Sequence, residues 1–250
     1  MASAMEPGTT RPRDGIIAIE LPEDGTSLIR KIISRSNART TGKYPSWKMN
    51  RMVHWQSRDQ LNSYRLLDSH PAVISFHEQP LLIHMSLNGV THLHYPDVLV
   101  ELGNSRELWS IRTNSDAQTL ETLAFTRLLQ KELPRFGFTH RLVTSETLAG
   151  EPHLSTSIML LRHGRQPVTL TEREHVRHIL EKVGFITWEA AQTGLLGLRG
   201  RAILARLALE GILQLHPDAR LVPQTRFIPA PNSSQGSAKW ALPDSAQAHS

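Results

Sequence analysis

The chain of 250 residues carries a formal net charge of +5 and contains no cysteine. A chain of this length forms one large domain or two small ones with an ample core, and its positive charge suits an anionic partner such as nucleic acid. The lack of cysteine excludes disulfide frameworks, cysteine-ligated zinc and thiol catalysis.

The N-terminal residues 1–27 are rich in proline, glycine, threonine and acids, which predicts a flexible lead-in. A short apolar patch from Ile16 to Leu21 predicts one strand within it. No apolar segment of signal-peptide type follows the first arginines, and no uncharged apolar run is long enough to cross a bilayer. We therefore expect a cytoplasmic protein that does not insert into a membrane.

The segment 30–51 is strongly basic and has aromatic residues between its cations. The cations are Arg30, Lys31, Arg35, Arg39, Lys43, Lys48 and Arg51, and the aromatic residues are Tyr44 and Trp47. Cations interleaved with aromatic rings suit the phosphate backbone of DNA, whereas the plainer interpretation is a solvated loop. We expect DNA contact here, with Lys43, Lys48 and Arg51 as phosphate-binding residues.

The stretch Ser57-Arg58-Asp59-Gln60 has the form of a capping box, so a helix should begin at Ser57. Leu61, Tyr64 and Leu67 follow at helical spacing and give this helix an apolar face. The dipeptide His70-Pro71 should end it, because the residue before a proline is driven out of helical geometry.

Extended segments follow the first helix. Val73 to Phe76 and Leu81 to Leu87 have the composition of strands. Asn88-Gly89 is a strong hairpin turn, which predicts that Thr91 to Tyr95 runs back beside the preceding strand.

A second hairpin is predicted directly afterwards. Val98 to Leu102 forms a short apolar strand with Asp97 at its start, and Leu108 to Ile111 forms the return strand. The turn between them is Gly103-Asn104-Ser105. Pro96 is tolerated just before the first of these strands, where it need not donate a ladder hydrogen bond.

The pattern changes to helical spacing after Arg112. Ser115 should cap a long helix whose apolar side runs from Leu120 to Leu129 and which stops before Pro134. A further strand is predicted over Phe138 to Thr144. Residues 28–150 thus form a helix, several antiparallel strands, a helix and a strand, which is typical of an α/β layer sandwich.

A second unit is predicted over residues 151–228. Thr171 opens another capping box, and Gly184 stops the helix that follows. Thr187 should cap a short helix, and Arg199 to Glu210 should form a third. Ile212 to Leu215 and residues 220–222 should pair as a hairpin.

Three short helices followed by a hairpin form a winged-helix layout. Such domains place the third helix and the wing on DNA, although many bind proteins instead. Arg199, Arg201 and Arg206 on that third helix give weak support to DNA. Residues 229–250 are rich in proline, serine, glutamine and alanine without periodicity, which predicts a disordered tail.

Four groups of residues between positions 42 and 97 stand in a distinctive order. They are Gly42-Lys43-Tyr44-Pro45-Ser46 with Lys48, Trp55 before the Ser57 helix, Asp68-x-x-Pro71-x-Val73 with Glu78-Gln79-Pro80, and Tyr95-Pro96-Asp97. In this order they resemble the TnsA-like endonuclease subunits of heteromeric transposases. The second unit also resembles the C-terminal domain of that family, so the resemblance covers most of residues 30–228.

This resemblance implies a restriction-endonuclease-like N-terminal domain of the PD-(D/E)xK type and a winged-helix C-terminal domain. It also implies a role in bacterial mobile elements, where the subunit nicks the 5′ ends of transposon DNA. The implied partners are transposon-end DNA, a DDE-type transposase subunit and an AAA+ ATPase regulator. The implied location is the cytoplasm, at the nucleoid during transposition.

The family site uses acidic oxygens to hold Mg²⁺ and a lysine beside the scissile phosphate. It takes a glutamate from the first helix, an aspartate from the Pro-Asp dipeptide, and a glutamate or glutamine two residues before a lysine. The corresponding positions here are Gln60, Asp97, Ser110 and Arg112. Asp97 alone keeps the family residue, and a carboxylate beside a guanidinium favours an ion pair over a bound metal. We expect Mg²⁺ as cofactor, with Asp97 as ligand, only if the site is active.

Other side chains do not restore the constellation. Asp59 points elsewhere on its helix, Glu101 lies too far along the strand from Asp97, and Glu107 has the opposite strand parity to Ser110. His92-x-His94 places two imidazoles on one strand face, where an ordinary sheet surface is the simpler interpretation than a metal pair.

Three hypotheses follow. The first is a TnsA-like subunit whose nuclease centre has decayed and which now binds DNA and assembles its partners. The second is an active or slow Mg²⁺-dependent endonuclease with a rearranged site. The third is a DNA-binding regulator with no role in transposition.

Overall fold

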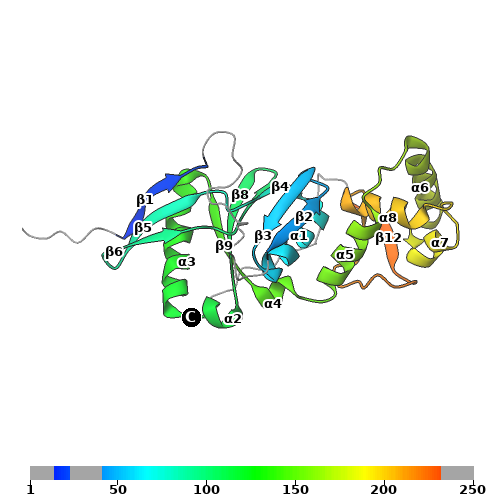
Figure 1. The fold of residues 1–250 in the computed structure, drawn as a ribbon. Helices are drawn as coiled ribbons and strands as arrows, with labels where there is room; N and C mark the ends of the chain where they lie inside the picture. Colours follow the sequence, from blue (N-terminus) through cyan, green and yellow to red (C-terminus); the bar gives the residue numbers. More distant parts are fainter. Residues whose placement is uncertain (1–13, 23–40, 232–250) are drawn as a thin grey trace, which may run out of the picture.

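A computed structural model describes residues 14–22 and 41–231 of the chain. It is a mixed α/β structure in which a sheet-rich unit and a mostly helical unit lie end to end, with α5 (His153–His163) between them (Figure 1). Within the described ranges, no helix has both the length and the apolar character needed to cross a membrane.

A four-stranded sheet forms the centre of the first unit. Its strands, in spatial order, are β4 (Val73–Glu78), β7 (Val98–Leu102), β8 (Ser105–Arg112) and β9 (Thr139–Thr144). The first three strands are antiparallel, as expected for the predicted hairpin, whereas β9 runs parallel to β8. A parallel neighbour needs a crossover connection. Here the crossover is made by α2 (Asn114–Ala117), α3 (Leu120–Glu132) and the 3₁₀ turn η1 (Leu133–Phe136).

Helices cover both faces of this sheet, and strand alternation decides which side chain meets which helix. Trp109 of β8 faces α1 (Arg58–Ser69) and shares a core with Tyr64. Its neighbour Leu108 points to the opposite face and packs with Leu129 of α3. Side chains with the parity of Leu108, including Ser110 and Arg112, therefore lie on the α3 side.

Two smaller sheets extend the first unit. The order β1-β5-β6 joins β1 (Gly15–Glu20), β5 (Leu82–Leu87) and β6 (Val90–His94). The second pairs β2 (Gly42–Ser46) with β3 (Arg51–Trp55) beside α1. Asn88 and Gly89 both have positive φ, 53° and 78°, so the predicted hairpin turn between β5 and β6 is confirmed.

The second unit has its own core and sheet. Its elements are α5, α6 (Leu170–Val183), β10 (Ile186–Thr187), α7 (Trp188–Gln192), α8 (Gly200–Leu209), β11 (Leu213–Gln214) and β12 (Arg226–Pro229). The short helix α4 (Ser145–Leu148) before them belongs to the first unit, because Leu148 lies in the same core as Tyr64. The strands lie in the order β10-β12-β11. Trp188 and Phe227 stack in the core of this unit, with ring centroids 5.8 Å apart.

Two predicted helix starts are wrong because a neighbouring residue makes the better cap. Thr113 and Thr119, not Ser115, cap two separate helices in place of the single predicted one. Thr169, not Thr171, forms the capping box of α6, together with Glu172. In each case a threonine three residues before an orphan backbone N–H accepts its hydrogen bond.

The predicted hairpin of this unit, Ile212 to Leu215 with residues 220–222, is also corrected. Val222 donates its backbone N–H to Arg220 and Thr225 donates to Val222, so residues 220–225 turn tightly around Pro223. Pairing with β11 begins only afterwards, at β12. Helix α5 is absent from the predicted layout. The predicted lead-in and tail, and the cations from Arg30 to Arg39, lie outside the described residues except for 14–22 and 229–231.

Candidate functional site

The positions singled out from the sequence meet at one end of the central sheet. Asp97 lies just before β7, and its backbone N–H donates to Trp109 at 2.8 Å. Its carboxylate accepts from the backbone N–H of Ile111 at 2.8 Å and from Gln60 Nε2 of α1 at 2.9 Å. Arg112 Nη1 lies 3.5 Å from the same carboxylate, so the expected ion pair is present.

Hydrogen bonding fixes the orientation of the Gln60 amide. Ser57 accepts from the backbone N–H of Gln60 at 3.1 Å, as the predicted helix start requires. Gln60 Oε1 accepts from the backbone N–H of Gln56 at 2.8 Å, which leaves the amide nitrogen facing Asp97. Gln60 therefore presents a donor to the pocket and not a carbonyl oxygen.

This donor set does not fit Mg²⁺. The ion takes oxygen ligands in a near-octahedral shell, and each of the three groups around Asp97 presents an N–H. The partial charges of these groups attract the carboxylate and repel a cation. Burial raises the pKa of Asp97, while the Ile111 hydrogen bond and the Arg112 charge oppose that rise. In residues 14–22 and 41–231, no three histidine or acidic side chains are grouped as metal ligands.

Ser110 is engaged on the α3 side of the sheet. Its Oγ lies 3.0 Å from His94 Nε2 of β6 and 3.0 Å from His140 Nε2 of β9. Burial, with the nearby positive charge of Arg112, lowers the pKa of His94 to about 4. Burial, followed by the charges of His94 and Arg112, lowers the pKa of His140 to about 3. Both rings are thus neutral at pH 7, and the hydroxyl bridges them by donating to one and accepting from the other.

A cleft opens beside this bridge, between β6 and the first turns of α3. It has a volume of about 340 Å³, and Arg112, His94, Thr122 and Phe125 line it. The same four residues also line a smaller cavity of about 40 Å³ that reaches Ser110. His140 was not singled out from the sequence. The sequence shows only that a histidine lies in the predicted strand over Phe138 to Thr144. The parallel pairing of that strand with β8 is what brings the histidine to this site.

The nearby acids are occupied elsewhere, in agreement with the sequence expectation. Asp59 accepts from Ser145 Oγ at 2.8 Å, and Glu101 accepts from Ser75 Oγ. Glu107 pairs with Arg141 at 2.8 Å on the face opposite Ser110.

The three predicted phosphate-binding cations have different environments. Lys48 Nζ points inward and donates to backbone carbonyls, at 3.2 Å to Leu67 and 2.8 Å to Val73. Burial lowers the pKa of Lys48 to about 8. Arg51 forms a two-pronged ion pair with Glu78, at 2.8 and 2.6 Å. Lys43 is exposed on β2 and is the one of the three with its charge turned to solvent.

The third helix of the second unit, α8, is largely buried, and its arginines are used within the protein. Arg199 pairs with Glu172 at 3.2 Å, and Arg201 lies over the Trp188 ring at 5.3 Å. Arg206 pairs with Glu210 at 2.6 Å. A recognition helix needs a free face, so these contacts remove the weak support that the arginines of α8 gave to DNA binding.

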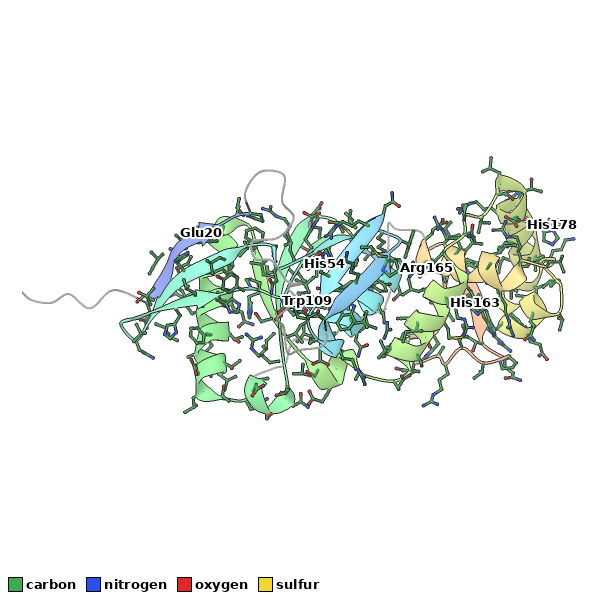
Figure 2. All side chains as sticks on the ribbon, in the orientation of Figure 1. Glu20, His54, Trp109, His163, Arg165 and His178 are labelled. Carbon is green, nitrogen blue, oxygen red and sulfur yellow. The ribbon has the colours of Figure 1, made fainter. Side chains whose placement is uncertain are left out.

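The two units contact each other through basic and aromatic side chains. Arg165, which Figure 2 labels near the second unit, donates to the backbone carbonyl of Pro45 at 2.8 Å. Arg206 lies 4.6 Å above the ring of Trp47, whose indole N–H donates to the backbone of Asp68 at 2.7 Å. No protein-family model matches the chain, and no curated protein matches it significantly.

Proposed function

We propose that this chain is a TnsA-like subunit of a DNA transposition machinery whose 5′-end nicking site has lost its metal. The carrying observation is the convergence of Gln60, Asp97 and Arg112 around a single carboxylate, with Ser110 on the same strand. These are the positions at which the family resemblance requires the catalytic groups. Their proximity supports a common origin of the pocket, and their chemistry supports loss of hydrolysis.

The topology supports the finer fold assignment. A helix, three antiparallel strands, a crossover helix and a parallel fourth strand follow in the order α1, β4, β7, β8, α3 and β9, as proposed for a restriction-endonuclease-like domain. In the second unit the order α6, β10, α7, α8, β11 and β12, with β12 in the middle of the sheet, supports a winged helix.

The distribution of charge supports different binding partners for the two units. The arginines of α8 are paired internally, which favours protein partners for the second unit. The exposed Lys43 and the cleft beside Arg112 favour the first unit for DNA. We propose that a DDE-type transposase subunit and an AAA+ ATPase regulator are the protein partners, at the bacterial nucleoid.

The decisive experiment is a nicking assay on transposon-end DNA with Mg²⁺ or Mn²⁺, comparing the native chain with Asp97→Ala. We expect DNA binding without nicking in both proteins. Metal-dependent nicking that disappears in Asp97→Ala would establish the alternative, an active endonuclease.

A restored variant is the positive control for that assay. Gln60→Glu, Ser110→Glu and Arg112→Lys together return the family residues to the pocket. The new carboxylate at 110 would lie between His94 and His140, whose ring N–H groups can donate to it. Nicking by this variant would show that the scaffold still positions DNA for cleavage.

Co-purification distinguishes the proposed transposition subunit from the alternative function, a DNA-binding regulator with no role in transposition. The native chain, mixed with the transposase and ATPase subunits from the same mobile element, should form a complex on transposon-end DNA. Binding to DNA with no affinity for either protein would favour the regulator.

A further inference from the structure

We propose that the cleft between β6 and α3 binds a phosphate group through Arg112 without any divalent cation. The identification of that group with the DNA backbone rests on the proposed function, whereas the site itself does not. The chemistry required of the ligand is a tetrahedral oxyanion small enough to approach a guanidinium from one side.

The hydrogen bonds of Arg112 leave part of its guanidinium free. Nη1 donates to the backbone carbonyl of Ile111 at 2.7 Å and lies 3.5 Å from Asp97. Nε and Nη2 make no hydrogen bond with the described part of the chain. The side chain is 37% exposed and lines both the open cleft and the inner cavity. A guanidinium that is anchored on one side and free on the other suits the two-pronged recognition of phosphate.

The opposite wall of the cleft adds a second donor. Thr122 lies in the first turn of α3, and its Oγ1 lies 2.9 Å from Thr119 Oγ1. The single hydrogen of the Thr119 hydroxyl also reaches the Asp116 carbonyl at 2.9 Å, and the Thr122 hydroxyl can rotate to turn its own hydrogen towards a ligand. The N-terminal end of this 13-residue helix also carries the positive end of the helix dipole. Glu121 is the acid among the residues that line the cleft, and it is exposed, so it can turn into solvent.

The inner end of the cleft favours an anion over a metal ion. Both carboxylate oxygens of Asp97 already have partners, so neither is free to act as a metal ligand in the cleft. His94 and His140 contribute neutral rings that are already bridged by Ser110. The guanidinium thus takes the electrostatic place that a divalent cation holds in a hydrolytic site, but it offers no bound water as a nucleophile.

Calorimetric titration of the full chain with pyrophosphate in EDTA tests the site. We expect saturable binding that Arg112→Gln weakens by about tenfold or more, as for loss of a charge-assisted hydrogen-bond pair. The matched control is Arg127→Gln, which removes the same charge from the exposed side of α3 and should bind like the native chain. Equal affinity of Arg112→Gln and the native chain would overturn the proposal, as would binding that appears only with Mg²⁺.

Two further variants test the site independently of whether Arg112→Gln folds. Arg112→Lys keeps the charge but lacks the planar fork, so its affinity should lie between those of the native chain and Arg112→Gln. Thr122→Val leaves Asp97 and Arg112 untouched and should weaken pyrophosphate binding about threefold, in the range of one neutral hydrogen bond. Native affinity in both variants would contradict the site.

Competition with a short duplex oligonucleotide identifies the source of the phosphate. Displacement of pyrophosphate by the duplex, lost in Arg112→Gln, places a DNA phosphate at Arg112. Pyrophosphate binding that DNA cannot displace would keep the anion site and remove support from the proposed function. Duplex binding that is equal in native and Arg112→Gln protein, without pyrophosphate binding, would overturn the site and leave the proposed function standing.

Discussion

Two enclosed aspartates of the first unit, Asp68 and Asp97, show how differently one residue type is used in the same domain. Asp68 has no exposed surface and accepts hydrogen bonds from four groups. They are the Tyr44 hydroxyl at 2.8 Å, the Ser46 hydroxyl at 2.6 Å, and the backbone N–H groups of Trp47 and Lys48, both at 3.2 Å. The side chain of Asp97 is 18% exposed, and it pairs with a guanidinium at the edge of a cleft.

The comparison distinguishes an aspartate that holds the fold together, Asp68, from one that lies in the candidate site, Asp97. Asp68 joins β2 and the turn after it to α1, and all its hydrogen-bonding donors are neutral. The groups that carry the family resemblance include Asp68 and its partners Tyr44, Ser46 and Lys48. Those groups therefore form a structural cluster, whereas, under the proposed function, the positions around Asp97 are the ones that differ from the family residues. The proposed function thus assigns the first aspartate to the fold and the second to the site, and the two can change independently.

The largest expected effect is on Asp68. Asp68→Ala should lower the free energy of unfolding by about 3–5 kcal/mol, because it leaves several buried donors without an acceptor. Chemical denaturation measures the loss, with Asp116→Ala on the exposed side of α2 as the control, expected within about 0.5 kcal/mol of the native chain. A loss no larger than that of the control would show that Asp68 is not a structural centre.

The next largest effect concerns pH and the histidine bridge. The pKa values of His94 and His140 in the folded chain, about 4 and about 3, lie below their ordinary value of 6.5. Between those values the unfolded chain binds the extra protons, so stability falls as pH drops below 6.5. Each group contributes about 1.4 kcal/mol per pKa unit. Thermal unfolding between pH 7.5 and 4.5 should show a shallower decline for His140→Gln, and an unchanged profile would contradict the shift.

A smaller effect is expected at Asp97. Asp97→Ala should cost about 1–2 kcal/mol, because the loss of its hydrogen bonds is offset by removal of a carboxylate that burial disfavours. The melting temperature of the native chain should be the same in EDTA and in Mg²⁺. A rise with Mg²⁺ that Asp97→Ala abolishes would show that the pocket binds the ion.

The smallest expected effect separates Lys43, a cation proposed to contact DNA, from Lys48, a cation held inside the protein. Lys43→Gln should reduce the slope of log affinity for DNA against log salt by about 1, as for loss of one phosphate contact. Lys48→Gln should leave that slope unchanged and lower stability, because its ammonium bonds to backbone carbonyls. Filter binding over a range of salt measures both, and equal slopes for native and Lys43→Gln protein would exclude β2 from the DNA contact.

The sequence predicted part of the candidate site. The family resemblance selected Gln60, Asp97 and Arg112, and the structure brings all three together. It did not predict that the Gln60 amide turns its nitrogen to Asp97, because the backbone of Gln56 sets that orientation. It also did not predict the bridge from Ser110 to His140, which depends on the parallel placement of β9.

The sequence by itself determined the features that depend on close neighbours along the chain. Ser57 at the start of α1, the Asn88-Gly89 turn and the Gly184 helix stop each follow from one residue's backbone preference or one local hydrogen bond. Tertiary structure alone decided which charges are free. Lys48 turns inward and the arginines of α8 pair internally because burial demands partners that lie far away in the sequence.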